Sequence, residues 1–434
     1  MARVLLLCQD VIGESMAGPA IRYWEFARAL SKTHEVTLLG HTALKTQPPE
    51  FRLLPRQTTS LAQVMQETDV VVTQIISPYV AWLAKRHGVR MICDAYDPMP
   101  LENLEIFKDL PLPLREDKHR HIVNTFNFCF QFADGVICAN SRQKDLWIGF
   151  SLSQHRITPQ TYDSDQTLNH FISTVPFGLS STLPQSCGES LRSRFNIPSD
   201  HKVLLWGGGI WNWFDPLTLI RAIKAVQTSR SDVHLVFMGI KHPNDQVPEM
   251  AMASKAIQLA KELNLLDTHV HFNYGWVPYQ ERQSFLLEAD FGVSTHFEHL
   301  ETRFAFRTRM LDYIWAGLPM LATQGDSFSE LIEKHELGIT VPDRDVEALT
   351  QAIVRLCEDP ALVEKMKEQL SEIRSQFYWE NVVKPLDRMI EKLRMAPAAG
   401  LSISDCWKIL IAGYREYSPK RCWNFLKKKL FGKR

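Results

Sequence analysis

The fold is decided at the start of the chain by the stretch RVLLLCQDVIGESMAGPAIRYWEFARALSKTHEVTLL, residues 3–39. Residues 3–8 form an apolar run typical of a buried strand, and a loop with two glycines follows. Residues 21–30 show helical periodicity, and residues 34–39 have the pattern of a second strand. Strand, glycine loop, helix and strand make a βαβ unit, which predicts a parallel sheet.

The same alternation of strands and helices runs through most of the chain. It breaks near residues 173–188 and resumes with a strand at 202–206. We therefore expect an α/β protein with two Rossmann-like, doubly wound domains facing a central cleft. The expected divisions are 1–178, 179–375, a closing helix at 376–395 that returns to the first domain, and a tail at 396–434. Further strands are expected at 69–76, 90–93, 135–138, 233–238, 270–273, 291–295, 320–323 and 338–341, and helices at 79–86, 116–132, 216–227, 250–263, 279–288, 307–316, 327–334, 345–356, 361–374 and 379–393. Asn140 and Ser141 are expected to cap a further helix that follows them.

Length and charge agree with this division. The chain has 434 residues, enough for two domains, and its hydrophobic fraction of 45% excludes general disorder. The 49 Lys and Arg balance the 49 Asp and Glu, so long-range attraction to nucleic acid is not expected. The tail, however, has nine basic and two acidic residues, a net charge of +7, which leaves 40 basic and 47 acidic residues, or −7, in the body.

The tail mixes its basic residues with apolar ones. Trp407, Tyr414, Trp423, Phe425 and Phe431 are among the latter. This composition suits an anionic membrane surface, and the alternative is a docked or disordered tail with an apolar stripe. No apolar run reaches the ~18 residues that a spanning helix needs. We expect a cytoplasmic protein, peripheral at the inner face of the membrane.

The eight cysteines are scattered and form no C-x-x-C pair. This pattern predicts neither a zinc site nor a disulfide framework, and it fits a reducing compartment.

In each predicted domain, one glycine loop follows the first strand. Gly13 and Gly18 precede the first helix, where free backbone N–H groups could meet an anion, although such a loop also serves turn geometry alone. In the second domain, residues 207–209 are three successive glycines, of which Gly208 and Gly209 would let a ligand approach the backbone. Trp211 could cover a ring face or belong to the core.

The densest group of chemical residues is EHLETRFAFRTRMLDYIWAGLP, residues 298–319. On a helix starting near Arg307, Arg309 and Asp312 share a face. The pair could be an ordinary surface salt bridge, but three arginines and two phenylalanines within residues 303–309 suit a diphosphate better.

This stretch and its sequel resemble the donor-binding segment of the retaining GT-B glycosyltransferases of family 4. That family combines a basic residue, two apolar residues, Glu, and then Ala-x-Gly-x-Pro before a strand; here residues 309–323 read RMLDYIWAGLPMLAT. The resemblance also includes Gly18-Pro19, residues 34–36 and residues 175–178, and it covers roughly residues 1–395. It implies an acceptor-side first domain and a nucleotide-binding second domain.

The resemblance implies roles for individual residues. Arg309 would contact the donor diphosphate, Asp312 would replace the glutamate that binds the ribose, and Gly18 would face the phosphates or sugar. The family's first acidic residue would fall on Phe304, so Glu301, or else Glu298, would serve instead.

Two further positions depart from the family. Its basic residues after the first strand of the second domain are missing, so Arg307 or Lys241 would take over. Its first-domain histidine is replaced by residues 94–97, DAYD.

The activity implied is hexosyltransferase-like, with retention of configuration. A sugar would move from a nucleotide diphosphate sugar to a glycan or lipid-linked acceptor in cell-surface polysaccharide or glycoconjugate synthesis, without a metal or cofactor. The alternatives are a catalytically inactive sugar- or nucleotide-binding protein and another GT-B enzyme such as a sugar-nucleotide epimerase.

Overall fold

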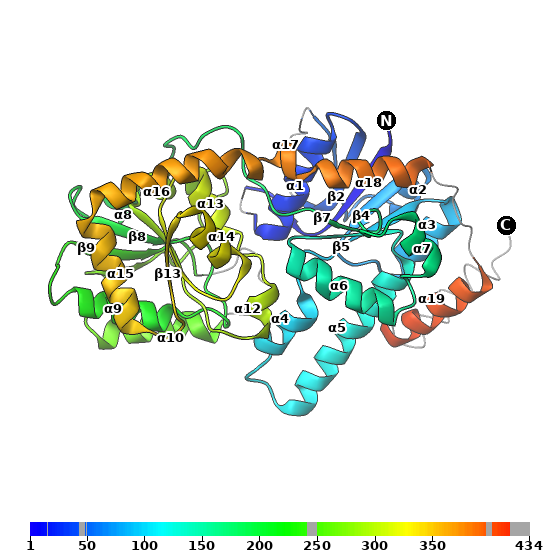
Figure 1. Ribbon diagram of the computed structural model, residues 1–434. Helices are drawn as coiled ribbons and strands as arrows, with labels where there is room; N and C mark the ends of the chain where they lie inside the picture. Colours follow the sequence, from blue (N-terminus) through cyan, green and yellow to red (C-terminus); the bar gives the residue numbers. More distant parts are fainter. Residues whose placement is uncertain (15, 43–47, 49, 241–249, 396–401, 417–434) are drawn as a thin grey trace.

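The computed structural model describes residues 1–434 apart from 15, 43–47, 49, 241–249, 396–401 and 417–434. It contains two parallel sheets side by side, each covered by helices (Figure 1). The expected α/β architecture of two doubly wound domains is confirmed.

The first sheet has seven strands in the order β3-β2-β1-β4-β5-β6-β7. All neighbouring strands are parallel, and β1, whose Leu5, Leu6 and Leu7 are fully buried, pairs with both β2 and β4. The strands are β1 (Arg3–Ile12), β2 (Glu35–Thr42), β3 (Arg52–Pro55), β4 (Val70–Thr73), β5 (Arg90–Asp94), β6 (Gly135–Cys138) and β7 (Ile172–Thr174). Its helices are α1 (Gly18–Leu30), α2 (Leu61–Gln66), α3 (Pro78–His87), α4 (Met99–Ile106), α5 (Leu112–Phe132), α6 (Ser141–Ser153) and α7 (Pro159–Ser164).

The second sheet has six strands in the order β10-β9-β8-β11-β12-β13, again all parallel. The strands are β8 (Lys202–Trp206), β9 (Val233–Phe237), β10 (Val270–Phe272), β11 (Phe291–Ser294), β12 (Met320–Thr323) and β13 (Gly338–Val341). The helices are α8 (Leu191–Phe195), α9 (Pro216–Val226), α10 (Ala251–Glu262), α11 (Arg282–Glu288), α12 (Leu300–Phe304), α13 (Arg309–Ala316), α14 (Ser327–His335), α15 (Val346–Glu358) and α16 (Pro360–Ile373).

The sequence pattern missed the 14-residue helix α19 (Ile403–Glu416), which lies in the expected tail. The other elements that it missed are short. They are the edge strands β3 and β7 and the helices α2, α4, α7, α8 and α12, of three to eight residues. Such segments hold too few residues to show a period, and pairing with a neighbour decides them. The helix expected to start near Arg307 begins at Arg309, because α12 occupies the preceding residues and the chain is extended at Ala305.

The end of the body crosses from one sheet to the other. After a 3₁₀ turn, η1 (Arg374–Phe377), the helices α17 (Trp379–Val382) and α18 (Lys384–Met395) lie over the first sheet, where α18 contacts β4 and β7 (Figure 1). The domain limits expected from the sequence stay predictions.

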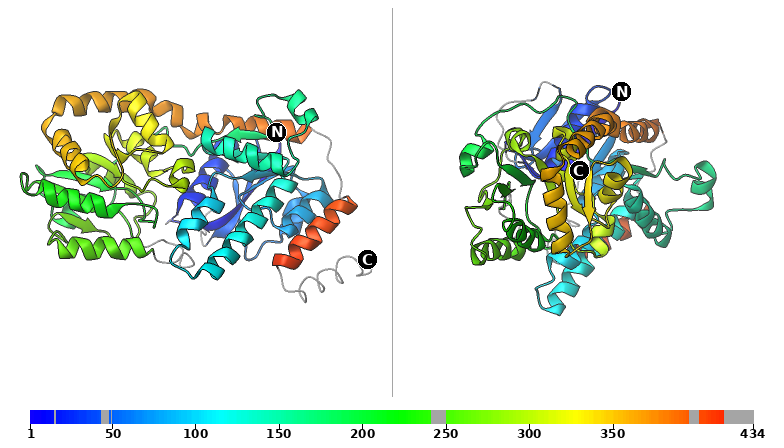
Figure 2. Two further views of the ribbon diagram at one scale, coloured as in Figure 1. Left: turned by 60° about the horizontal axis from the view of Figure 1, so that its bottom comes forward. Right: turned by 60° about the vertical axis from the view of Figure 1, so that its left-hand side comes forward.

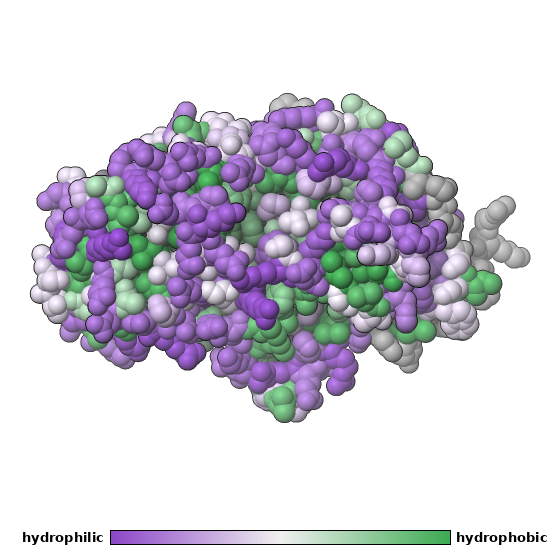
Figure 3. All heavy atoms as spheres, viewed as in Figure 1, coloured by the Kyte–Doolittle hydropathy of each residue, from purple (hydrophilic) through white to green (hydrophobic). Residues whose placement is uncertain are grey.

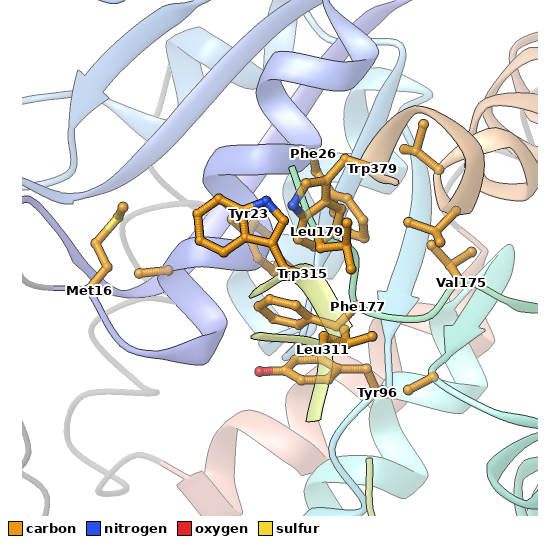
Figure 4. Close-up of a cluster of buried hydrophobic side chains, with 14 of the residues drawn as sticks. Met16, Tyr23, Phe26, Tyr96, Val175, Phe177, Leu179, Leu311, Trp315 and Trp379 are labelled. Atoms are coloured by element: carbon orange, nitrogen blue, oxygen red, sulfur yellow. The ribbon is translucent and has the colours of Figure 1, made fainter. Parts of the chain in front are cut away.

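A buried apolar cluster joins the two halves (Figure 4). The Trp379 ring lies 5.9 Å from that of Phe26 and 5.0 Å from that of Phe177. Leu311 and Trp315 of α13 belong to the same cluster, so the second half contributes to it directly. This packing fixes the geometry of the space between the sheets.

The last described helix is α19 (Ile403–Glu416), which packs on α3 (Figure 2). On the face seen in Figure 3 the surface is largely hydrophilic, with apolar side chains gathered over α5 and α6. Within the described residues, no helix is both long and apolar enough to cross a bilayer.

Candidate active site

A cavity of about 500 Å³ lies between the two sheets, at the carboxyl ends of their strands. The first half contributes loops after β1, β4 and β5, including residues 16–19 and 96–97. The second half contributes residues 207–209 after β8 and, at the start of α13, Arg309, Leu311 and Asp312. Open parallel sheets bind their ligands at this edge, so the cavity is the candidate active site.

The glycine loop after β8 is held open toward the cavity. Gly208 has φ +76°, a conformation that favours glycine. The Gly207 N–H donates to the Tyr313 hydroxyl at 2.8 Å, and that hydroxyl lies 2.8 Å from the Leu205 carbonyl oxygen. Gly208, Gly209 and Trp211 line the cavity as the sequence suggested, and Trp211 stacks on the buried Trp213 at 5.2 Å and 7°.

Arg309 is a buried cation in the cavity wall without a carboxylate partner among the described residues. Its exposed fraction is 8%, and its Nη2 donates to the Gly209 carbonyl oxygen at 2.9 Å. Its guanidinium lies over the rings of Trp206 and Phe214, at 4.6 and 4.1 Å. Nη1 is buried and has no hydrogen-bond partner within the described part of the chain. Burial lowers the pKa of Arg309 to about 9, so the guanidinium remains charged at neutral pH.

Arg307 also lines the cavity, but its charge is already balanced. Its two terminal nitrogens donate to Glu301 Oε1 and Oε2 at 2.9 and 2.8 Å. Asp326 lies 4.0 Å from Arg307 Nε and 3.5 Å from His296 Nε2. Glu301 is 2% exposed and is not among the cavity-lining residues. The structure thus places Glu301, which was expected to serve as the family's first acidic residue, behind Arg307 as its counter-ion.

Asp312 lines the cavity next to Arg309 and has a cationic partner from another helix. Arg282 Nε of α11 donates to Asp312 Oδ1 at 3.2 Å. The same guanidinium lies 3.9 Å from the Tyr279 ring and 4.8 Å from the Trp315 ring. Arg282 also lines the cavity, and sequence reasoning missed it because it lies 30 residues before its partner.

The remaining expected residues are less closely grouped. Gly18 lines the cavity at the start of α1, where no side chain caps the helix and a Cβ would lie 3.7 Å from the Tyr96 hydroxyl. Glu298 is exposed, outside the cavity wall, and its N–H donates to Asp343. Lys241 lies outside the described residues.

Two carboxylates of the first half face the same cavity, and no role was predicted for them. Asp97 follows β5 and accepts a hydrogen bond from Gln74 Nε2 at 3.3 Å; Glu102 lies on α4. Burial raises the pKa of Asp97 to about 7, and burial together with Asp97 raises that of Glu102 well above its usual range. The signal available in the sequence was the polar DAYD run directly after a buried strand. The described residues contain no group of three or more side chains suited to a metal ion.

Comparison with known proteins agrees with this geometry. Residues 201–359 match the family model of glycosyl transferases group 1. This segment of the chain is therefore similar to the group 1 glycosyltransferases. The match contains the glycine loop, Arg307, Arg309 and Asp312, which all line the cavity from the second half.

Two curated relatives share part of the chain. One is the lipopolysaccharide 1,2-N-acetylglucosaminetransferase of Salmonella typhimurium, 25% identical over 227 residues, which are 51% of this chain and 56% of the relative. The other is the chitobiosyldiphosphodolichol beta-mannosyltransferase of Candida glabrata, 26% identical over 121 residues, or 27% of this chain and 26% of the relative. The chain thus matches about half of the first relative's length and a quarter of the second's.

Solved structures show the same GT-B fold across nearly the whole chain. The Anabaena protein HepE, solved with UDP and glucose, is 16% identical with a TM-score of 0.63, covering 91% of this chain and 100% of HepE. WaaG, described as a glycosyltransferase of lipopolysaccharide biosynthesis, is 15% identical with a TM-score of 0.60, covering 89% and 98% of the two chains. At these identities the likeness establishes the fold.

Proposed function

We propose that this protein is a group 1 glycosyltransferase, a retaining and hexosyltransferase-like enzyme. It transfers a sugar from a nucleotide diphosphate sugar to a glycan or lipid-linked acceptor in cell-surface polysaccharide or glycoconjugate synthesis. The observation that carries the proposal is Arg309, a buried cation that lines the cavity and has no anionic partner in the described part of the chain. A buried charge without a counter-ion is costly, and a diphosphate in the cavity would supply one.

The second half binds the donor in this mechanism. As the glycosidic bond breaks, negative charge grows on the leaving diphosphate while the sugar becomes oxocarbenium-like. Arg309 stabilises that charge, and the N–H groups at Gly208 and Gly209 lie in the same wall. Arg307 lines the same wall, but Glu301 already balances its charge.

The first half receives the acceptor, whose hydroxyl attacks the sugar from the side that the diphosphate leaves. Attack on that face retains the anomeric configuration, and a leaving phosphate oxygen takes the hydroxyl proton. This route assigns no metal or cofactor. The relatives support the acceptor class, since one is named for lipopolysaccharide and the other for a dolichol-linked glycan, and the HepE complexes with UDP-glucose support a UDP-sugar donor.

An acceptor of this kind places the enzyme in the cytoplasm at the inner membrane surface. The basic, aromatic-rich end of the chain supports that location through its attraction to anionic lipid.

Thermal shift against UDP, GDP and ADP tests donor binding, because a ligand at ~100 times its dissociation constant adds ~2.7 kcal/mol of stability. We expect one nucleotide to raise the melting temperature, and the anomeric configuration of the transferred sugar to match that of the donor. Binding without transfer to any acceptor preparation would favour an inactive binding protein. Release of an epimerised sugar without an acceptor would favour an epimerase. One solved protein of similar fold, from Listeria monocytogenes, is named as a UDP-N-acetylglucosamine 2-epimerase.

A further inference from the structure

The helix α19 ends the described part of the chain and is anchored on the first half by one face. Ser402 and Asp405 cap its start reciprocally: the Asp405 N–H donates to Ser402 Oγ at 3.0 Å, and the Ser402 N–H donates to Asp405 Oδ2 at 3.1 Å. Ile409 is 6% exposed and packs in the apolar cluster of the first sheet, with Ala412 beside it. The contact with α3 therefore fixes which side of α19 faces outward (Figure 2).

The outward side of α19 carries three large apolar residues. Ile403, Trp407 and Ile411 are spaced four residues apart, so they lie along one face of the helix. Their exposed fractions are 80%, 63% and 51%. Single exposed apolar side chains are ordinary, but a row of three on one helix face marks an interaction surface. We call these three residues the α19 stripe.

The chain that follows α19 indicates what covers the stripe. Residues 417–434 lie outside the described structure; their sequence has seven Lys and Arg and no Asp or Glu, a net charge of +7. Trp423, Phe425 and Phe431 are interleaved with them. A basic segment next to an apolar helix face provides the two signals that stable attachment to an anionic bilayer requires.

A second copy of the chain fits the stripe less well. A stable dimer buries roughly 800 Å² on each partner, far more than three side chains of one 14-residue helix provide. Two copies joined here would also bring two +7 segments together, and like charges repel.

We propose that Ile403, Trp407 and Ile411 of α19 enter the headgroup region of an anionic bilayer, and that the basic residues after the helix hold the charged lipids. The proposal rests on the proposed function only in placing the acceptor at this surface. It assigns membrane contact to a defined helix face, held in position relative to the catalytic cavity by the docking of α19 on the first half.

Sedimentation of the full chain with vesicles tests this inference. The vesicles are phosphatidylcholine alone or phosphatidylcholine mixed with phosphatidylglycerol. We expect binding to the mixed vesicles only. Trp407→Ser should weaken that binding several-fold, and Ile403→Ser/Trp407→Ser/Ile411→Ser should weaken it at least tenfold. Leu183→Ser is the control for Trp407→Ser, because Leu183 is 54% exposed and lies away from α19 in the sequence.

A second set of variants leaves the described fold untouched. Lys427→Glu/Lys428→Glu/Lys429→Glu should abolish binding to the mixed vesicles, and far-UV circular dichroism should show every variant folded. Unchanged binding of the stripe variants, or equal binding of the wild type to neutral vesicles, overturns the proposal. So does a dimer without lipid that Trp407→Ser dissociates, because the stripe would then be covered by a second copy.

The failure of this proposal is separable from failure of the proposed function. Nucleotide-induced thermal shift should be the same in the wild type and in the stripe variants, because α19 contributes nothing to the cavity wall. A wild type that binds vesicles but no nucleotide refutes the proposed function alone.

Discussion

Arg307 and Arg309 are two residues apart, yet their surroundings differ in how far they balance the guanidinium charge. Glu301 already neutralises Arg307 through two hydrogen bonds, whereas Arg309 has two aromatic faces and one carbonyl oxygen. Truncating each arginine should therefore have a different consequence: loss of charge stabilisation for Arg309, and an unpaired buried carboxylate for Arg307.

We predict that Arg309→Ala lowers kcat by about 10²- to 10³-fold, the usual cost of removing one preorganised donor to developing charge. Arg303→Ala is the matched control, because Arg303 is exposed and outside the cavity wall. Transfer rates and far-UV circular dichroism measure the effect. Near-wild-type turnover of a folded Arg309→Ala protein would contradict the role of Arg309.

Glu301→Gln should destabilise the fold. The carboxylate side chain is 1% exposed, and its loss leaves Arg307, 5% exposed, without its partner. Breaking a buried pair in this way costs about 3 kcal/mol or more. Urea denaturation measures the loss, with Glu298→Gln as the exposed control on the same segment. Equal stability of the two variants would show that Glu301 has another role, such as direct contact with the sugar.

Asp97 should make donor affinity depend on pH. Its pKa of about 7, raised by burial, means that the carboxyl loses its proton as the pH rises through neutrality. The ionised form repels a diphosphate in the same cavity, so nucleotide affinity should fall as pH increases past about 7. In Asp97→Asn that fall should disappear. Calorimetric titration with nucleotide on both sides of neutral pH measures the affinity. A fall in affinity that persists in Asp97→Asn would assign the effect to another group.

At the scale of elements, a chain of histidines lies outside the cavity wall, with His234 on β9, His271 on β10, and His201 and His269 directly before β8 and β10. His201 Nδ1 lies 2.9 Å from His234 Nε2, and His234 Nδ1 lies 3.0 Å from His271 Nε2. The His269 ring stacks 5.3 Å from that of His234. Burial and the neighbouring histidines, with Arg192, lower the pKa of His234 to about 4.

His271 has a similar shift. Burial lowers its pKa to about 4, with an opposing effect of Asp267 and a reinforcing one of His269. In the unfolded chain both His234 and His271 regain pKa values near 6.5. Above about pH 6.5 both are neutral in either state. Between about pH 6.5 and 4 the unfolded chain binds protons that the folded one does not, so folding stability is lost as pH falls.

We predict that each of the two histidines lowers the free energy of unfolding by about 1 kcal/mol per pH unit as the pH falls from about 6.5 to 4. Urea denaturation at a series of pH values measures the slope. His234→Gln should make it shallower between about pH 6.5 and 4, and an unchanged slope would exclude the histidine chain as its source. His155, on a loop of the first half, provides the control substitution His155→Gln.

At the scale of the whole molecule, the start of α6 links the two halves. Gln143, fully buried, donates through Nε2 to the Tyr96 carbonyl oxygen at 2.8 Å in the first half and to that of Phe304 at 2.9 Å in the second. Asn140 Nδ2 donates to the Ala305 carbonyl oxygen at 3.2 Å. These bonds hold the cavity walls facing one another.

Gln143→Ala should loosen this contact. We expect a larger radius of gyration in solution and a higher KM for the donor, while each half keeps its secondary structure. Gln154→Ala is the matched control, because Gln154 ends the same helix and its partners Gln131 and Asn127 all lie in the first half. Small-angle scattering with and without nucleotide measures closure, and identical curves for wild type and Gln143→Ala would contradict the link.

Much of the fold was predictable because it is encoded locally. Buried strands such as β6 and β8 were located to the residue, and Asn140 caps α6 as expected, accepting from the Gln143 N–H at 2.8 Å. The site was less predictable. Arg309 and the glycine loop follow from motif and position, but Asp97, Glu102 and Arg282 line the cavity without a spacing that links them to it.

The sequence by itself determined the two doubly wound sheets, the glycine loops at their carboxyl ends and the contrast between an acidic body and a basic tail. Each depends on neighbours within one turn or one strand, or on a simple count. Only the tertiary structure decided which arginine is neutralised, which carboxylates face the cavity and which side of α19 is left exposed. These depend on contacts between elements far apart in the sequence, such as that of Arg309 with Gly209, 100 residues away. The local periodicity of the sequence does not predict such contacts.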